Sequence, residues 1–187
     1  MLPRRALLAA PLLLALAAPA AGAGADGAEN PAGLVILMRH AEAPGFGDPP
    51  GLRLGDCATQ RNLDDRGRAQ ARRMGALLRE RGIRAARVHS SQWCRCLDTA
   101  RLLDLGPVAE LPALNSTVPN PAERESRTAD LRRFLAALPA DGPPVVLVTH
   151  QVTITSLTGI HPASGEAVLL RATGTPNPPV LGRLKPP

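Results

Sequence analysis

The chain has 187 residues, of which 44% are hydrophobic and 20% charged, enough for one domain with a substantial core and too apolar for a disordered protein. Its net charge of +6 comes from scattered arginines, with Lys185 as the only lysine, and its aromatic residues are Phe46, Trp93 and Phe134. Without a basic cluster or a set of aromatic side chains for base stacking, we expect no nucleic-acid partner.

The first 23 residues have the pattern of a secretory signal peptide. Arg4 and Arg5 precede the apolar stretch 6–18, and the small residues 21–23 follow as a cleavage site. A membrane anchor is the alternative, but the stretch is shorter than the roughly 20 residues that a span requires. The sequence therefore predicts export to the periplasm or the medium, without stable membrane insertion.

The mature chain is expected to begin with a linker over residues 24–33, rich in Gly, Ala, Pro and Asn, and to continue as a single domain over residues 34–187. The apolar run 34–38 is short and rich in branched side chains, which is typical of a buried strand. A loop rich in Gly and Pro follows over residues 44–56. Apolar residues at helical spacing then predict a helix from residue 64 or 65 to a stop at Gly82.

Strands and helices continue to alternate toward the C-terminus, which indicates a layered α/β domain. The tail over residues 172–187 is rich in proline and is expected to be irregular. The further predicted strands are a short one at Val88 and those at 108–111, 145–148 and, at the sheet edge, 166–171; the further predicted helices are 92–103, 128–138 and 151–157.

Export places the three cysteines in an oxidising compartment, where a disulfide can persist. Cys94 and Cys96 are too close in sequence to bridge easily if they lie on one helix, so we expect Cys57 to pair with one of them. A zinc site is the alternative, but the chain lacks a CxxC spacing and a convincing fourth ligand.

Two predicted buried strands each end in a histidine, His40 and His150, and the carboxyl ends of such strands can meet at one edge of a sheet. Arg39 directly precedes His40, and Arg95 lies in the first turn of a predicted helix. Arginine forks and helix N-termini both suit phosphate. A histidine beside such a cradle can attack phosphorus, and a second histidine can stabilise the transferring group.

At these residues the chain resembles the histidine phosphatase superfamily, which has the phosphoglycerate mutase-like fold. Four motifs carry the resemblance in the family's order, and together they run through most of the mature chain. The motifs are Arg39-His40-Ala41-Glu42 after an apolar strand, Arg61-x-Leu63-x-x-x-Gly67 before a helix, Ser90-Ser91-x-x-x-Arg95 with Thr99-Ala100, and Val148-Thr149-His150.

The resemblance implies a three-layer α/β/α sandwich with a mostly parallel sheet. It further implies an enzyme that hydrolyses a phosphomonoester through a covalent phosphohistidine on His40, with His150 completing the pocket. Arg39, Arg95 and, with less specific support, Arg61 would bind the phosphate. No metal or cofactor is implied, and the expected partner is a small or envelope-linked phosphorylated substrate. The sequence indicates no oligomeric state.

The chain departs from the family pattern at three positions. Ala41 replaces the usual glycine, which is a small change only if the backbone there has a negative φ. Gln151 and Ser116 stand where different branches of the family carry the acid that protonates the leaving group. The carboxylates that remain as candidates from their loop positions are Glu42, Asp48, Glu110, Glu123 and Glu125.

A missing acid suits a substrate whose leaving group needs little protonation, such as a phosphoramidate or an acyl phosphate. It also suits a different class of protein, in which the arginine cradle binds a phosphorylated ligand without turnover. Both hypotheses follow from the sequence.

Overall fold

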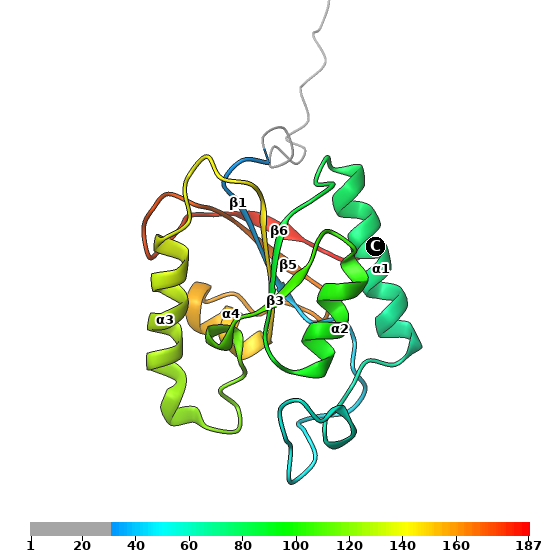
Figure 1. Cartoon of the computed structure of the whole chain (residues 1–187). Coiled ribbons are helices and arrows are strands. Elements are labelled where there is room, and N and C mark those ends of the chain that lie inside the picture. Colours follow the sequence, from blue (N-terminus) through cyan, green and yellow to red (C-terminus); the bar gives the residue numbers. More distant parts are fainter. Residues whose placement is uncertain (1–30) are drawn as a thin grey trace, which may run out of the picture.

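The computed structural model describes residues 31–187 (Figure 1). The expected signal peptide and most of the expected linker lie outside these residues. The strands are β1 (Leu34–Arg39), β2 (Arg87–Ser90), β3 (Val108–Glu110), β4 (Val145–Thr149), β5 (Ala167–Arg171) and β6 (Val180–Leu184). The helices are α1 (Asp65–Glu80), α2 (Cys94–Leu103), α3 (Arg124–Ala136) and α4 (Gln151–Thr158), with short 3-10 turns η1 (Cys57–Thr59), η2 (Pro112–Leu114) and η3 (Pro121–Glu123).

The strands form one sheet in the order β3-β2-β4-β1-β5-β6. β1, β2, β3 and β4 run parallel to one another, whereas β5 is antiparallel to both β1 and β6. The sheet is therefore mostly parallel, as the resemblance implied. Its centre is formed by β1 and β4, which lie side by side although they are far apart in the sequence.

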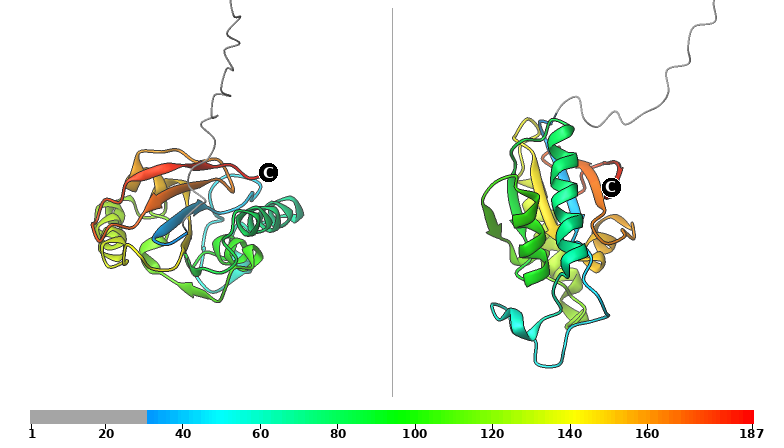
Figure 2. Two further views of the ribbon diagram at one scale, coloured as in Figure 1. Left: turned by 90° about the horizontal axis from the view of Figure 1, so that it is seen from above. Right: turned by 90° about the vertical axis from the view of Figure 1, so that its right-hand side faces the viewer.

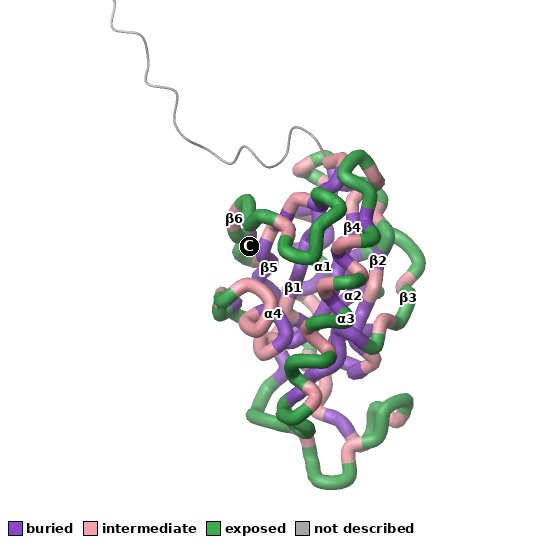
Figure 3. The backbone as a smooth tube through the Cα atoms, turned by 90° about the vertical axis from the view of Figure 1, so that its left-hand side faces the viewer, coloured by how far each residue is buried: buried purple, intermediate pink, exposed green. Residues whose placement is uncertain are grey.

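Helices cover both faces of the sheet, with α1 and α2 on one face and α3 and α4 on the other (Figures 1 and 2). Each face has its own apolar core, one centred on Met74, Leu103 and Ile36, the other on Leu131, Leu135 and Leu147. The central strands are buried on both sides, which explains their continuous apolar sequences (Figure 3). The three-layer α/β/α sandwich is confirmed.

Helix α1 packs closely on the last residue of the first motif. Asp64 caps the helix by accepting a hydrogen bond from the Gly67 backbone N–H at 2.8 Å. A Cβ atom on Gly67 would lie 1.9 Å from the Glu42 carbonyl oxygen. The glycine of the second motif therefore allows the backbone beside His40 to contact the helix.

The prediction for the C-terminal tail was wrong, because residues 180–184 form β6 and pair with β5. The prolines of the tail lie before and after the strand rather than within it, and an edge strand tolerates such neighbours. Helix α3 also begins earlier than predicted, at Arg124. No helix within residues 31–187 has the length and apolar character that a membrane crossing requires.

Candidate active site

The structure brings the two histidines of the motifs together. β1 and β4 are parallel neighbours with Arg39 opposite Thr149, so His40 and His150 leave the sheet at the same edge. Their ring centroids are 5.6 Å apart, and the two residues are only 3% and 4% exposed.

His40 is held in one tautomer. Its Nδ1 lies 2.7 Å from the Ala41 carbonyl oxygen, which can only accept, so Nδ1 carries the proton and Nε2 keeps its lone pair. Burial lowers the pKa of His40 to about 3, and the charges of Arg95 and Arg39 act in the same direction against the opposing hydrogen bond to Ala41. The ring is therefore neutral near pH 7, with Nε2 available as a nucleophile.

A chain of hydrogen bonds orients His150. Asn115 Oδ1 accepts from the Gln92 backbone N–H at 2.9 Å and from the Ser91 hydroxyl at 3.1 Å. Because the Ser91 proton is used in this way, its Oγ accepts from His150 Nε2–H at 2.9 Å. Burial, followed by the adjacent His40, lowers the pKa of His150 well below its usual value. His150 is thus neutral, with its proton on Nε2.

Arg39, Arg61 and Arg95 line one cavity of about 400 Å³ together with both histidines. Burial lowers the pKa of Arg39 and of Arg61, and repulsion by Arg95 adds to this. An anion in the cavity would relieve that repulsion. The arrangement fits phosphate, for which arginine forks are well suited.

Backbone carbonyls hold two of these arginines in place. Arg39 Nη1 donates to the Pro162 oxygen at 3.0 Å, while Arg61 donates to the Gly47 oxygen at 2.7 Å and to the Ala43 oxygen. The buried Arg39 Nε has no hydrogen-bond partner among the described residues. These contacts leave donors on both side chains for a ligand.

Of the five carboxylates considered as acids, Asp48 alone lines the cavity. It accepts two hydrogen bonds from Arg95, at 2.6 and 3.1 Å, one from Trp93 Nε1 at 3.2 Å and one from the Arg61 backbone N–H at 3.1 Å. Burial raises the pKa of Asp48, but the bonds and charge of Arg95 outweigh this and keep it below the usual value. Asp48 is therefore ionised and does not supply a proton.

The other carboxylate candidates lie outside the cavity. Glu110 accepts a hydrogen bond from Gln92, and Glu123 forms an ion pair with Arg127. Glu42 and Glu125 line separate surface hollows. No acid for the leaving group is found among these carboxylates.

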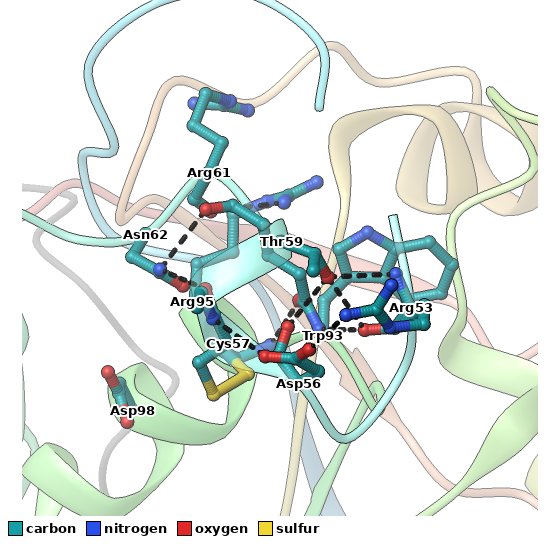
Figure 4. Close-up of a disulfide and its surroundings, with 12 residues drawn as sticks. Arg53, Asp56, Cys57, Thr59, Arg61, Asn62, Trp93, Arg95 and Asp98 are labelled. Carbon is teal, nitrogen blue, oxygen red and sulfur yellow. Dashed lines mark hydrogen bonds and ion pairs between the residues drawn. A yellow bond between two sulfur atoms is a disulfide. The ribbon is translucent and has the colours of Figure 1, made fainter. Parts of the chain in front are cut away.

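A disulfide joins Cys57 to Cys94, with the two Cα atoms 5.7 Å apart (Figure 4). This decides between the two pairings that the sequence left open. Cys96 is buried and free, and burial raises the pKa of its thiol to about 12. The zinc hypothesis loses two of its ligands to the bridge, and residues 31–187 contain no cluster of His, Cys, Asp and Glu suited to a metal.

Ala41 fits the first motif without strain, because Asp104 is the only non-glycine residue of positive φ within residues 31–187. The Ala41 backbone N–H donates to Thr99 Oγ1 at 3.0 Å, which links the first motif to the third. The sequence did not indicate that Ser91 and Asn115 orient His150 or that Asp48 pairs with Arg95, because these partners are distant in the sequence.

The model of the histidine phosphatase superfamily (branch 1) matches residues 35–117, which include the first three motifs. Over these residues the chain is similar to the histidine phosphatase superfamily. The match ends before His150, and the fold places this residue beside His40 as the fourth motif requires. No curated protein matches the chain significantly.

Solved structures with the histidine phosphatase fold cover most of the chain. The protein histidine phosphatase SixA, complexed with tungstate, has 18% identity and a TM-score of 0.59 over 82% of this chain and 97% of its own. A mycobacterial glucosyl-3-phosphoglycerate phosphatase has 18% identity and a TM-score of 0.57 over 81% and 98%. A phosphoserine phosphatase variant from Entamoeba histolytica, in complex with phosphoserine, has 16% identity and a TM-score of 0.52 over 80% and 95%. At these identities the likeness establishes the fold.

Proposed function

We propose that the protein is an exported, metal-independent phosphatase that acts through a covalent phosphohistidine on His40. The observation that carries the proposal is the neutral His40, whose Nε2 lone pair lies in a cavity lined by Arg39, Arg61 and Arg95. Export to the periplasm rests on the N-terminal sequence pattern, and independence of metal rests on the family resemblance.

In the first step, His40 Nε2 attacks phosphorus, so that an N–P bond forms while the bond to the leaving group breaks. The imidazole becomes positively charged. The Ala41 carbonyl oxygen stabilises this charge because it accepts a hydrogen bond from His40 Nδ1–H. The arginines bind the phosphoryl oxygens during transfer. Water then attacks phosphorus, which releases inorganic phosphate and restores neutral His40.

The leaving group is the chemical constraint on the substrate. An alkoxide requires a proton as it departs, and the one carboxylate in the cavity, Asp48, is ionised. This observation favours a second candidate activity, on a phosphoramidate or an acyl phosphate. SixA is a protein histidine phosphatase, and this activity is compatible with that candidate because phosphohistidine is a phosphoramidate.

A substrate screen of the purified mature chain tests the proposal. Phosphomonoesters, phosphoramidates and acyl phosphates are assayed as substrates in the presence of a chelator. The His40→Ala variant is assayed in parallel, and the phosphoprotein is trapped by quenching without acid. We expect turnover that survives the chelator, and we expect His40→Ala to lose both turnover and the acid-labile phosphoprotein. Full activity in His40→Ala would exclude the mechanism. A folded wild type that binds phosphate but hydrolyses no substrate would instead indicate the binding protein.

A further inference from the structure

The guanidinium of Arg95 presents different edges to Asp48 and to His40. An arginine has five N–H donors, and the planar group offers one fork at Nη1 and Nη2 and a second at Nε and Nη2. The first fork of Arg95 faces the two oxygens of Asp48, at 2.6 and 3.1 Å. At the second fork, Nε–H lies 3.3 Å from His40 Nε2.

The remaining donors of Arg95 can be assigned in the same way. The second Nη1 proton is directed to the Arg61 carbonyl oxygen at 3.3 Å. The second Nη2 proton has no hydrogen-bond partner among the described residues, and covalent geometry places it parallel to Nε–H. A ligand at the second fork therefore meets one unpartnered donor on Nη2 and the Nε–H that donates to His40 Nε2 in its absence.

Asp48 itself is fully bonded and nearly buried. Its side chain is 12% exposed and that of Arg95 is 4% exposed, and the carboxylate also accepts from Trp93 Nε1 and the Arg61 backbone N–H. A phosphoryl group attacked by His40 Nε2 must lie on the Nε side of Arg95, away from Asp48. Substrate binding thus does not require the carboxylate to leave.

We propose that Asp48 is a positioning residue, which holds the Nη1 and Nη2 edge of Arg95 so that the Nε and Nη2 edge faces phosphate at His40. The proposal rests on the proposed function, because it assigns Arg95 to phosphate. The competing model is a plug, in which the carboxylate of Asp48 occupies the phosphate site and must be displaced. The two models predict opposite effects of removing the charge of Asp48.

The first experiment is a double-mutant cycle on the binding of inorganic phosphate. The Kd of each variant is measured by isothermal titration calorimetry at a temperature well below the melting temperatures of all variants. Asp48→Asn should raise the Kd about tenfold or more, because a small misplacement of a binding group is costly. In an Arg95→Ala background the same substitution should change the Kd little. A Kd that stays equal or falls in Asp48→Asn, or the same factor in both backgrounds, would overturn the proposal.

Asp56→Asn is the matched control. Asp56 lies on the same loop and carries the same charge, but it pairs with the exposed Arg53, and asparagine caps the following turn equally well. We expect its phosphate Kd to match that of the wild type. An equal loss in Asp56→Asn would show that the effect is not specific to Asp48 and would contradict its positioning role.

The second experiment uses the wild type and therefore does not depend on the folding of a variant. In a crystal structure with tungstate, Asp48 should still contact Nη1 and Nη2 of Arg95, and tungstate should contact Nε and Nη2. Tungstate at the Nη1 and Nη2 edge, with Asp48 displaced, would establish the plug. Neither experiment requires turnover. A wild type without activity would therefore refute the proposed function, while the two binding experiments would still decide the role of Asp48.

Discussion

His40 and His150 are buried as neutral rings among positive charges, and this arrangement has a cost that depends on pH. Burial lowers the pKa of both residues below the value near 6.5 that they have in the unfolded chain. Between that value and about pH 3, the unfolded state therefore binds protons that the folded His40 does not. The neutral nucleophile is thus obtained at the expense of stability in acid.

The free energy of unfolding should therefore fall as the pH is lowered from 6.5 toward 4. Each histidine contributes a slope of at most about 1.4 kcal/mol per pH unit. Urea unfolding at several pH values, in the wild type and in His40→Gln, measures the slope. The variant should lose less stability on acidification, while His161→Gln, at an exposed position, should behave like the wild type. An undiminished slope in His40→Gln would contradict the neutral burial of this ring.

At the scale of elements, the loop that carries Asp48 and Arg61 is attached to the first turn of α2. The disulfide from Cys57 in η1 to Cys94 is one attachment, and Gln60, whose Oε1 accepts from the Cys94 backbone N–H at 2.9 Å, is another. Arg95 follows Cys94 directly. The loop and the helix therefore form one unit that fixes the relative positions of Asp48, Arg61 and Arg95 in the cavity.

Replacing both Cys57 and Cys94 with serine should lower the free energy of unfolding by about 4 kcal/mol, as expected for a bridge that joins residues 37 positions apart. It should also raise the Kd for inorganic phosphate, because the loop can then move relative to Arg95. Denaturant unfolding and calorimetry measure the two effects. Dithiothreitol should lower the Tm of the wild type but not of the double variant. If the folded double variant bound phosphate with the wild-type Kd, the disulfide would not be needed to position the site.

At the scale of the whole molecule, the antiparallel edge of the sheet, formed by β5 and β6, is connected to the site by hydrogen bonds and an ion pair. Glu166, whose side chain is only 2% exposed, pairs with Arg183 of β6 at 2.7 Å and accepts from the Ala163 backbone N–H at 2.8 Å. The same loop provides the Pro162 oxygen that holds Arg39 and the Gly165 N–H that donates to the His40 carbonyl. The last strand of the chain is thereby linked to the first motif.

Arg183→Met should destabilise the protein by about 1–3 kcal/mol, since it leaves the carboxylate of Glu166 buried without its charged partner. Combining Arg183→Met with Glu166→Gln should restore part of the loss, because the unpaired charge is then absent. Chemical denaturation of the three proteins measures both effects. If the double variant were less stable than Arg183→Met alone, the unpaired charge would not be the cause.

The sequence by itself determined the alternation of strands and helices, the buried central strands and the resemblance to the family. It also predicted one site for His40, His150 and the three arginines, and the structure places these residues around one cavity. These features are recorded locally, in hydrophobic periodicity and in short motifs at the ends of strands. Each motif was recognisable before its position in space was known.

Only the tertiary structure decided which distant groups meet. The choice of Cys94 over Cys96, the contact of Asp48 with Arg95, the chain from Asn115 to His150 and the pairing of β6 all join segments that are far apart in the sequence. The lowered pKa of Asp48 depends on such a contact, and nothing in its own loop marks it as the partner of Arg95. A charge pattern along the chain does not specify this pairing, because it is set by the packing of the loop against α2.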